Sequence, residues 1–447
     1  MKTFLKTIFR LTFIIALQNC IVYGVGLADT VMLGNYDELS LSGAAVSNQI
    51  QFFLQLIAAG AGEGVVVLCS QYWGKREIKP IQSIISAGLK IGVAMSFVLM
   101  IFVYFNPETA LSIFTDKKDV ITEGAKYLKI VSLSYVFFMV AQILIASLRS
   151  VEIVKLGLVV AVTALVTNVG LNYILIYGNF GAPEKGIEGA AIATLISRII
   201  EFSIVVFYVF VIDKRINFKI KHLFKHNKQL LGDYLRAGIP IIISGAMWGV
   251  GNGAQLAILG RLESESVIAA NVVAATVFQI ITVVAYGAAS ASGVVIGKTI
   301  GAGAGIDTIK KYSKVLQMIF LGLGLVTSAA LFLSRDFVIA IHNDITPESK
   351  ELARQFITIL SVTVIGTAYQ MAVLTGIVRG GGDTKFVLIN DTIFIWLIVI
   401  PSAAIAAFVL NLSPIIVFIC LKSDQILKCA VAAVHVNRYK WIKKLTR

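Results

Sequence analysis

Four polar side chains interrupt long apolar runs of this sequence, and their chemistry suits cation binding. Asp29 lies about five residues before the end of the first apolar run, and Thr194 about eight residues into the sixth. Asn168 and Asn172 are four residues apart in the fifth run, so a helix would place them on one face. A carboxylate surrounded by amide and hydroxyl oxygens suits a proton or a hard monovalent cation such as Na⁺. We therefore predict a cation site at Asp29, Asn168, Asn172 and Thr194.

A structural interpretation of the same residues stays open. Asp29 would then be a helix-end residue, and the two asparagines would hydrogen-bond neighbouring helices together. A charge at the centre of a bilayer costs roughly 2.5–3.5 kcal/mol on insertion scales, so a buried Asp29 needs a partner or a function under either interpretation.

Other ionisable residues in the apolar runs give weaker signals. Glu63 lies in a glycine-rich stretch, where it would line a cavity or mark a broken helix. Arg198 and Glu201 are three residues apart and would neutralise each other. Asp391 and Asp424 are expected to reach water at the membrane interface.

Large amphipathic residues suggest a second site, for an organic ligand. Aromatic and methionine side chains form adaptable surfaces for apolar or cationic molecules, although such residues on helices also serve as packing. The candidates for a substrate cavity are Phe52, Phe53, Tyr135, Met139, Trp248, Asn252, Gln255, Phe278, Gln279, Tyr286, Tyr369 and Met371.

The elements that must position these residues are membrane-spanning helices. The 447 residues are 57% hydrophobic and only 14% charged, whereas soluble domains carry about 25% charged residues. A spanning helix needs about 20 mainly apolar residues. The sequence contains twelve such runs, at 11–34, 43–72, 82–106, 124–148, 154–178, 187–213, 236–260, 267–297, 312–334, 353–379, 386–410 and 413–436. We predict an all-α membrane protein with twelve transmembrane helices.

The net charge of +14 is distributed in a way that orients these helices. With both termini in the cytoplasm, the inner segments hold 22 Lys and Arg and the outer loops hold 6. This asymmetry follows the positive-inside rule and explains the basic charge without a nucleic-acid partner. The richest segment, 214–235, is predicted to be a basic cytoplasmic linker; binding to anionic lipid headgroups is the alternative for it.

The linker divides the chain into two similar halves. Val31–Gly34 resembles Ala257–Gly260 at an offset of 226, and Arg149 corresponds to Arg379 at an offset of 230. Each half has an even number of spans, so the halves would be parallel repeats about the membrane normal. We predict an N-lobe at 1–213 with the first six helices, the linker at 214–235, and a C-lobe at 236–447 with the last six and a basic tail.

Enzyme signatures are missing from the sequence. There is no His-Glu-x-x-His and no Gly-x-Ser-x-Gly, and Gly301, Gly303 and Gly305, which resemble a phosphate-binding loop, are not followed by Lys-Ser or Lys-Thr. The four cysteines lack paired spacing. We expect a protein that is not an enzyme, with no cofactor; a membrane-embedded enzyme is the alternative from a different class.

Several motifs together resemble the multidrug and toxic compound extrusion (MATE) family of transporters, within the multidrug, oligosaccharidyl-lipid and polysaccharide exporter superfamily. These motifs cover nearly the whole chain in the same order. They are Gly26–Gly34, Gln71–Lys75, Asn168–Gly178, Gly189–Thr194 and Arg379–Thr384.

The resemblance implies two six-helix lobes and multidrug efflux by alternating access, with export of amphipathic or cationic compounds in exchange for H⁺ or Na⁺. It also implies that Asp29, Asn168, Asn172 and Thr194 couple transport to the cation in the N-lobe and would hold the metal if that cation is Na⁺. The implied partners are small-molecule drugs and membrane lipids. The implied location of this multi-pass protein is a bacterial plasma membrane, where it would act as a monomer.

The sequence also departs from the family pattern. Relatives of the NorM type carry acids in the seventh and tenth helices, but Trp248 and Ala368 stand near those positions here, which argues against a C-lobe cation site. Asn172 replaces an Asp of some relatives, so Asp29 is the one clear carboxylate of the N-lobe site. A flippase for lipid-linked sugars is the alternative function, although it would need a more cationic cavity.

Overall fold

The structure is a computed structural model that describes residues 1–225, 227–262, 265–341 and 346–446. Its described part is helical throughout and contains no strand. The chain divides into two compact units, each described by itself below. The N-terminal unit contains residues 17–69 and 77–242, and the C-terminal unit contains residues 1–16, 70–76 and 243–447.

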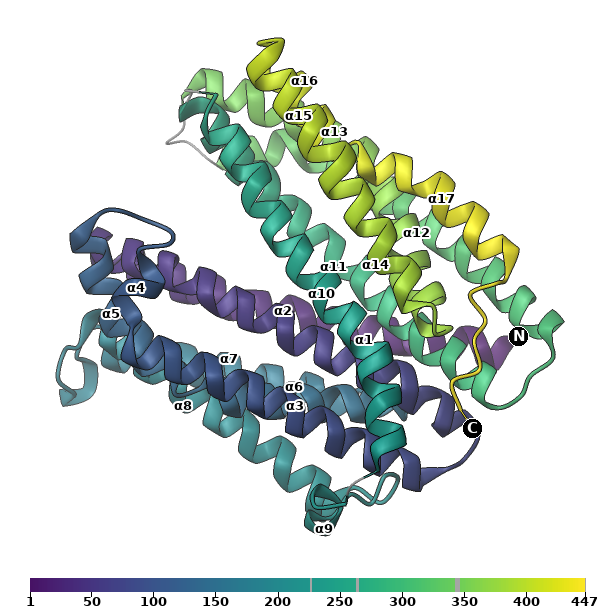
Figure 1. The fold of residues 1–447 in the computed structure, drawn as a ribbon. Coiled ribbons are helices and arrows are strands. Elements are labelled where there is room, and N and C mark those ends of the chain that lie inside the picture. Colours follow the sequence, from purple (N-terminus) through teal and green to yellow (C-terminus); the bar gives the residue numbers. More distant parts are fainter. Residues whose placement is uncertain (226, 263–264, 342–345, 447) are drawn as a thin grey trace. The chain divides into compact units, whose positions relative to one another are not determined.

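The first half of the chain forms the helices coloured from purple to teal (Figure 1). They are α1 (Lys2–Gly34), α2 (Glu38–Gly74), α3 (Ile78–Phe105), α4 (Pro107–Leu111), α5 (Lys118–Ser132), α6 (Tyr135–Ser150), α7 (Lys155–Leu175), the 3₁₀ turn η1 (Asn179–Gly181), α8 (Gly186–Phe207) with its π-helical end η2 (Tyr208–Ile212), and α9 (Ile220–Leu223).

The second half of the chain continues with long helices, several of which contain π-helical turns. They are α10 (Lys228–Gly260), α11 (Glu265–Gly301), α12 (Ile306–Ile341), α13 (Pro347–Met371), η3 (Ala372–Val378), α14 (Thr384–Thr392), η4 (Ile393–Val399), α15 (Ile400–Ala404), η5 (Ile405–Val409), α16 (Pro414–Lys422) and α17 (Asp424–Arg438).

Ten described helices, each counted with its π-helical continuation, are long and apolar enough to cross a membrane. The number is eleven if α5 and α6, which meet at a bend of 52°, form one span. The remaining predicted span, 413–436, corresponds to α16 and α17, which Ser423 separates into two shorter helices. Large apolar side chains lie exposed on the helices, for example Phe13 at 69% and Leu333 at 79%, as a lipid-facing surface requires.

Two boundaries between the units stand at equivalent positions of the sequence repeat. The boundary in α1 falls after Ala16 and the boundary in α10 falls after Ile242, 226 residues later. That offset equals the one that relates the two halves of the sequence. Pro240 lies inside α10 two residues before its boundary, and it removes one backbone hydrogen bond from the helix there.

Residues 441–445, near the end of the chain, pack onto the C-terminal unit. Trp441 is fully buried and its indole nitrogen donates to the Val436 carbonyl at 2.7 Å. The backbone nitrogen of Leu445 donates to Gln71 Oε1 at 2.8 Å, and Lys443 Nζ contacts Asp383 Oδ1 at 2.7 Å. The basic tail therefore packs against the ends of α2 and η3 in this unit.

The predicted linker packs against α3 in the N-terminal unit. Ile216 and Phe218 are buried, and Gln82 Nε2 of α3 donates to the Ile216 carbonyl at 2.8 Å. The side chain of Ser86 in turn donates to the Leu223 carbonyl at 3.1 Å. These contacts hold residues 216–223 of the linker against α3. His226, also in the linker, lies outside the described residues.

Candidate functional site

The four residues predicted to bind the coupling cation meet in the N-terminal unit, although they come from three helices. Asn172 Nδ2 on α7 donates to Asp29 Oδ1 on α1 at 2.5 Å. The same amide group contacts Asn168 Oδ1, one turn earlier on α7, at 3.3 Å. Asn168 Nδ2 then donates to Thr194 Oγ1 on α8 at 3.4 Å. The side chains thus form one continuous hydrogen-bonded chain, which we call the Asp29 centre.

The Asp29 centre lies inside the helix packing and holds an unbalanced charge. Asn168, Asn172 and Thr194 are buried, and Asp29 is half-buried. The partner of Asp29 is a neutral amide, and it forms no ion pair within the described part of the chain. While it is ionised, a carboxylate held only by neutral groups in an apolar region has no counter-charge, so binding of a proton or a cation would stabilise it.

One oxygen of the centre has no partner. Asn172 Oδ1 is buried and accepts no hydrogen bond in the described structure. Leaving a buried acceptor unpaired costs free energy, which binding of a proton donor or a cation would recover. A proton on Asp29 and a Na⁺ ion between the oxygens would both satisfy this atom, so the side chains present fit either coupling ion.

Sequence reasoning missed two side chains beside this centre. Tyr127 of α5 is fully buried and its hydroxyl interacts with Thr194 and, at 3.4 Å, with Gln51 Nε2 of α2. These residues extend the hydrogen-bonded chain toward α2 and α5. A lone Tyr or Gln in an amphipathic helix carries no spacing signal, so only the packing reveals them.

Two ion pairs neutralise charged residues within the predicted spans of this unit, and only the Arg198–Glu201 pair is expected from the sequence. Arg198 pairs with Glu201 at 2.7 Å, one turn after Thr194 on α8, as the spacing indicates. Glu63 does not line an empty space, because it pairs with Arg149 of α6 at 2.6 Å. Both pairs neutralise charges within the N-terminal unit.

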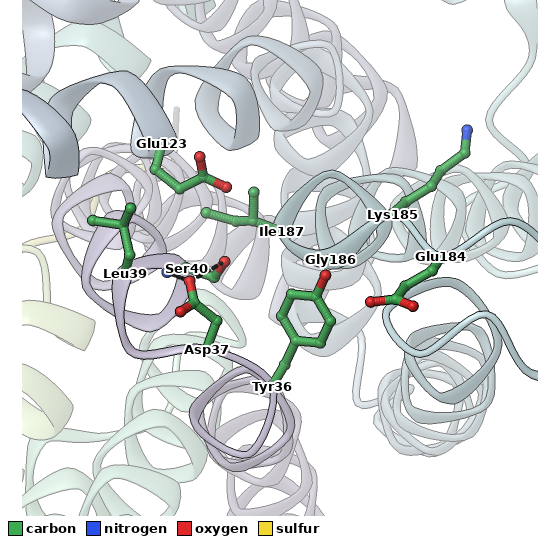
Figure 2. A pocket seen from close by; sticks show the side chains of 9 residues that line it. All are labelled: Tyr36, Asp37, Leu39, Ser40, Glu123, Glu184, Lys185, Gly186 and Ile187. Carbon is green, nitrogen blue, oxygen red and sulfur yellow. Dashed lines mark hydrogen bonds between the residues drawn. The ribbon is translucent and has the colours of Figure 1, made fainter.

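A pocket lies at the end of this unit where α1 turns into α2 (Figure 2). It has a volume of about 440 Å³ and is lined by Tyr36, Asp37, Leu39, Ser40, Glu123, Glu184, Lys185, Gly186 and Ile187. Asp37 accepts from the backbone nitrogen of Ser40 at 2.8 Å and from its hydroxyl at 3.0 Å, and these bonds hold the pKa of Asp37 below its usual value. The pocket contains no residue of the Asp29 centre, and of its three acids Asp37 caps α2 and Glu123 pairs with Lys126 at 2.7 Å.

The predicted substrate-cavity residues do not form one set within either unit. Tyr135 and Met139 are buried in the N-terminal unit, where Met139 packs beside Gly92. Phe53, Trp248 and Tyr286 are about two-fifths exposed. Tyr369 donates to Gln317 Oε1 at 2.9 Å in the C-terminal unit. The others are half-buried or exposed, and they are Phe52, Asn252, Gln255, Phe278, Gln279 and Met371.

The comparisons with known proteins agree with this architecture. The model of the MatE family matches the chain twice, over residues 15–174 and 240–405. A protein of Thermotoga maritima named probable multidrug resistance protein NorM is 24% identical over 96% of this chain and 92% of its own length. The uncharacterized transporter YisQ of Bacillus subtilis is 23% identical over 99% of this chain and 96% of its own.

Solved structures share the fold at low sequence identity. A MATE structure in the straight conformation superposes with a TM-score of 0.87 at 18% identity, covering 97% of this chain and 95% of that one. A multidrug resistance MATE family transporter in the outward-facing conformation superposes with a TM-score of 0.88 at the same identity and coverage. The chain therefore belongs to the MatE family and has its fold of twelve membrane helices in two six-helix lobes.

Proposed function

We propose that this protein is a secondary active multidrug transporter that exports amphipathic and cationic organic compounds in exchange for H⁺ or Na⁺. Family membership and the relatives named as multidrug resistance proteins support the drug substrates. The observation that carries ion coupling is the Asp29 centre, where a carboxylate without a counter-charge meets an unpaired amide oxygen.

The coupling mechanism follows from the charge of this centre. Binding of a proton or Na⁺ at Asp29 neutralises it and lets Asn172 Oδ1 gain a partner. A ligand shifts a conformational equilibrium only through its different affinity for the two states. In this proposal the cation favours the state that releases the drug, and loss of the cation returns the transporter to the drug-binding state. In this proposal the protein acts as a transporter and not as an enzyme, in line with its family.

The proposed setting is the plasma membrane of a bacterium, with both termini in the cytoplasm and a monomer as the working unit. The distribution of Lys and Arg supports this orientation, and the bacterial relatives support the membrane. A protease-cleavable tag on the C-terminus should be cut in inside-out vesicles and protected in intact cells. Cleavage in intact cells would overturn the orientation.

The test of the function uses ethidium accumulation in bacterial cells that lack their own efflux pumps. Expression of the wild-type chain should lower ethidium accumulation, and Asp29→Asn should raise it to the level of the empty vector. Asp37→Asn is the matched control, because Asp37 lies only eight residues later and caps α2 through Ser40. Wild-type efflux by a well-expressed Asp29→Asn variant would contradict ion coupling at this centre.

A further inference from the structure

A second buried polar centre lies in the C-terminal unit, where the sequence pattern argued against a cation site. Lys428 Nζ of α17 contacts Asp391 Oδ1 of α14 at 3.2 Å and Asp424 Oδ2, one turn earlier on α17, at 3.2 Å. Asp391 Oδ2 also accepts from Ser244 Oγ of α10 at 2.9 Å. The side chains of Lys428 and Asp424 are 5% and 8% exposed, and that of Asp391 is 20% exposed. We call these four residues the Lys428 centre.

The Lys428 centre lies on the three helices of the second half that the repeat makes equivalent to the helices of the Asp29 centre. The first, fifth and sixth spans carry Asp29, Asn172 and Thr194, and the seventh, eleventh and twelfth carry Ser244, Asp391 and Asp424. Thr194 and Arg198 have counterparts in Asp424 and Lys428, 230 residues later, at the offset that relates Arg149 to Arg379. The two centres therefore lie on equivalent helices, and on the last of these Asp424 and Lys428 stand at the positions equivalent to Thr194 and Arg198.

The Lys428 centre has one more negative charge than positive charge when all its groups are ionised. Two carboxylates share a single ammonium group, and Ser244 is neutral. A second ammonium, Lys422 of α16, lies over the ring of Phe418 at 5.6 Å and acts on Asp424 through its field. Because Lys428 already fills the space between the two carboxylates, the centre has room for a proton rather than for a metal ion.

The described hydrogen-bond partners of Asp424 are all donors. Gln425 Nε2 donates to Asp424 Oδ1 at 3.0 Å. The orientation of this amide is fixed by α13, because Thr367 Oγ1 and Gln370 Nε2 both donate to Gln425 Oε1, at 3.0 and 3.1 Å. An N–H group can only donate, so Asp424 faces donors on both oxygens and has no acceptor for a proton of its own.

Asp391 has a partner that tolerates protonation. The hydroxyl of Ser244 donates to the carboxylate, and it can rotate to accept a hydrogen bond when the carboxyl is protonated. Asp391 is also the more exposed of the two acids, which leaves a route for a proton. Of the remaining groups near Asp424, the Cys429 thiol donates to the backbone carbonyl of Gly366 and does not compete for the proton.

We propose that the Lys428 centre is a second proton-binding site, in which Asp391 takes up the proton and Asp424 and Lys428 remain a fixed ion pair. The proposal rests on the proposed function, because it adds a second ion to the same transport cycle. Together with the Asp29 centre, it gives each of the two halves of the molecule one titrating carboxyl group.

Infrared difference spectroscopy of the purified full-length chain in lipid membranes tests this directly, without any drug. A protonated carboxyl group has a carbonyl band that an ionised one lacks. Lowering the pH from neutral to mildly acidic should produce such a band in the wild type. The band should be absent from the spectrum of Asp391→Asn and present in that of Asp424→Asn. Ser244→Ala, which keeps every charge, should move the band to higher frequency because the carboxyl group loses a hydrogen bond.

The outcomes separate this proposal from the proposed function. A band that survives in Asp391→Asn, or that disappears in Asp424→Asn, would overturn the assignment to Asp391. An unshifted band in Ser244→Ala would overturn it even if the Asp391 variant failed to fold. A band removed by Asp29→Asn belongs to the other centre. If the spectrum contains a band from Asp29 but none from Asp391, the proposed coupling at the Asp29 centre stands and the second proton site is overturned.

Discussion

The two units hold carboxylates inside apolar helix bundles in opposite ways. The Asp29 centre surrounds one carboxylate with amides and a hydroxyl, and it contains no cation of its own among the described residues. The Lys428 centre places an ammonium group between two carboxylates. A carboxylate held by neutral dipoles has no counter-charge unless a cation binds from outside. In an internal ion pair, the ammonium group already neutralises most of the carboxylate charge. The first arrangement therefore favours ligand binding, and the second favours stability with a single site for a proton.

The comparison predicts that removing the cation of the Lys428 centre has the largest effect on folding. Lys428→Met leaves two carboxylates facing each other without a counter-charge, and breaking a buried pair in this way costs about 3–5 kcal/mol. The yield of folded protein and its melting temperature in detergent should fall sharply. The measurement is the fraction of monodisperse protein after heating, followed by size-exclusion chromatography.

A double variant sharpens this prediction. Lys428→Met combined with Asp391→Asn removes one positive and one negative charge, so it should recover part of the lost stability. Equal stability of the single and double variants would show that Lys428 acts through packing, for instance against the ring of Phe394 at 5.9 Å, and not through charge.

The corresponding change in the Asp29 centre should affect stability less and transport more. Asn172→Ala removes one interhelical hydrogen bond, which is worth about 1–2 kcal/mol in a membrane bundle. Ethidium efflux should nevertheless fall well below that of the wild type, because Asn172 holds Asp29 in place. Thr194→Val, three hydrogen bonds away from Asp29 along the chain of side chains, is the graded control and should lose less activity. A stable Asn172→Ala variant with full efflux would show that the asparagine serves only as glue between helices.

Outside both centres, the linker has a pH dependence of its own, which must be separated from theirs. Burial and the neighbouring Lys225, Lys221 and Lys219 lower the pKa of His222 below its usual 6.5. The neutral ring accepts a hydrogen bond from the Lys219 backbone nitrogen at Nδ1, at 3.0 Å. The stabilisation of the linker is complete above the usual pKa and is lost as the pH falls through the lowered value.

Hydrogen exchange checks this smallest effect. Protection factors in the segment around α9 should fall between about pH 8 and pH 5 in the wild type. His222→Asn, whose amide oxygen accepts a hydrogen bond without titrating, should remove that pH dependence. A pH response that persists in His222→Asn would assign it to another group.

The Asp29 centre and the number of spans could be predicted from sequence because each depends on local patterns. Asn168 and Asn172 share a helix face by spacing alone, and Asp29 and Thr194 stand out as polar residues in apolar runs. What joins them is the packing of α1, α7 and α8, and the resemblance to a known family supplied that relation. Tyr127 and Gln51 lie beside the centre only because α2 and α5 pack there.

The Lys428 centre could not be predicted because its residues come from three helices that lie apart in the chain, and Lys428 is only one of several Lys and Arg inside the apolar runs. Asp391 and Asp424 were expected to reach interfacial water, but both pair with Lys428 instead. One local signal was available, the spacing of four residues between Asp424 and Lys428 on one helix face. The charges of Asp424 and Lys428 make α17 much less apolar than α16, which precedes it.

The most direct test of the central claim measures coupled transport in proteoliposomes that contain only the purified protein. An imposed pH gradient or Na⁺ gradient should drive ethidium movement by the wild-type chain, and the effective gradient identifies the ion. Asp29→Asn should still bind ethidium and exchange it between the two sides, but it should show no gradient-driven accumulation. Gradient-driven accumulation by Asp29→Asn at the wild-type rate would contradict the assignment of coupling to the Asp29 centre.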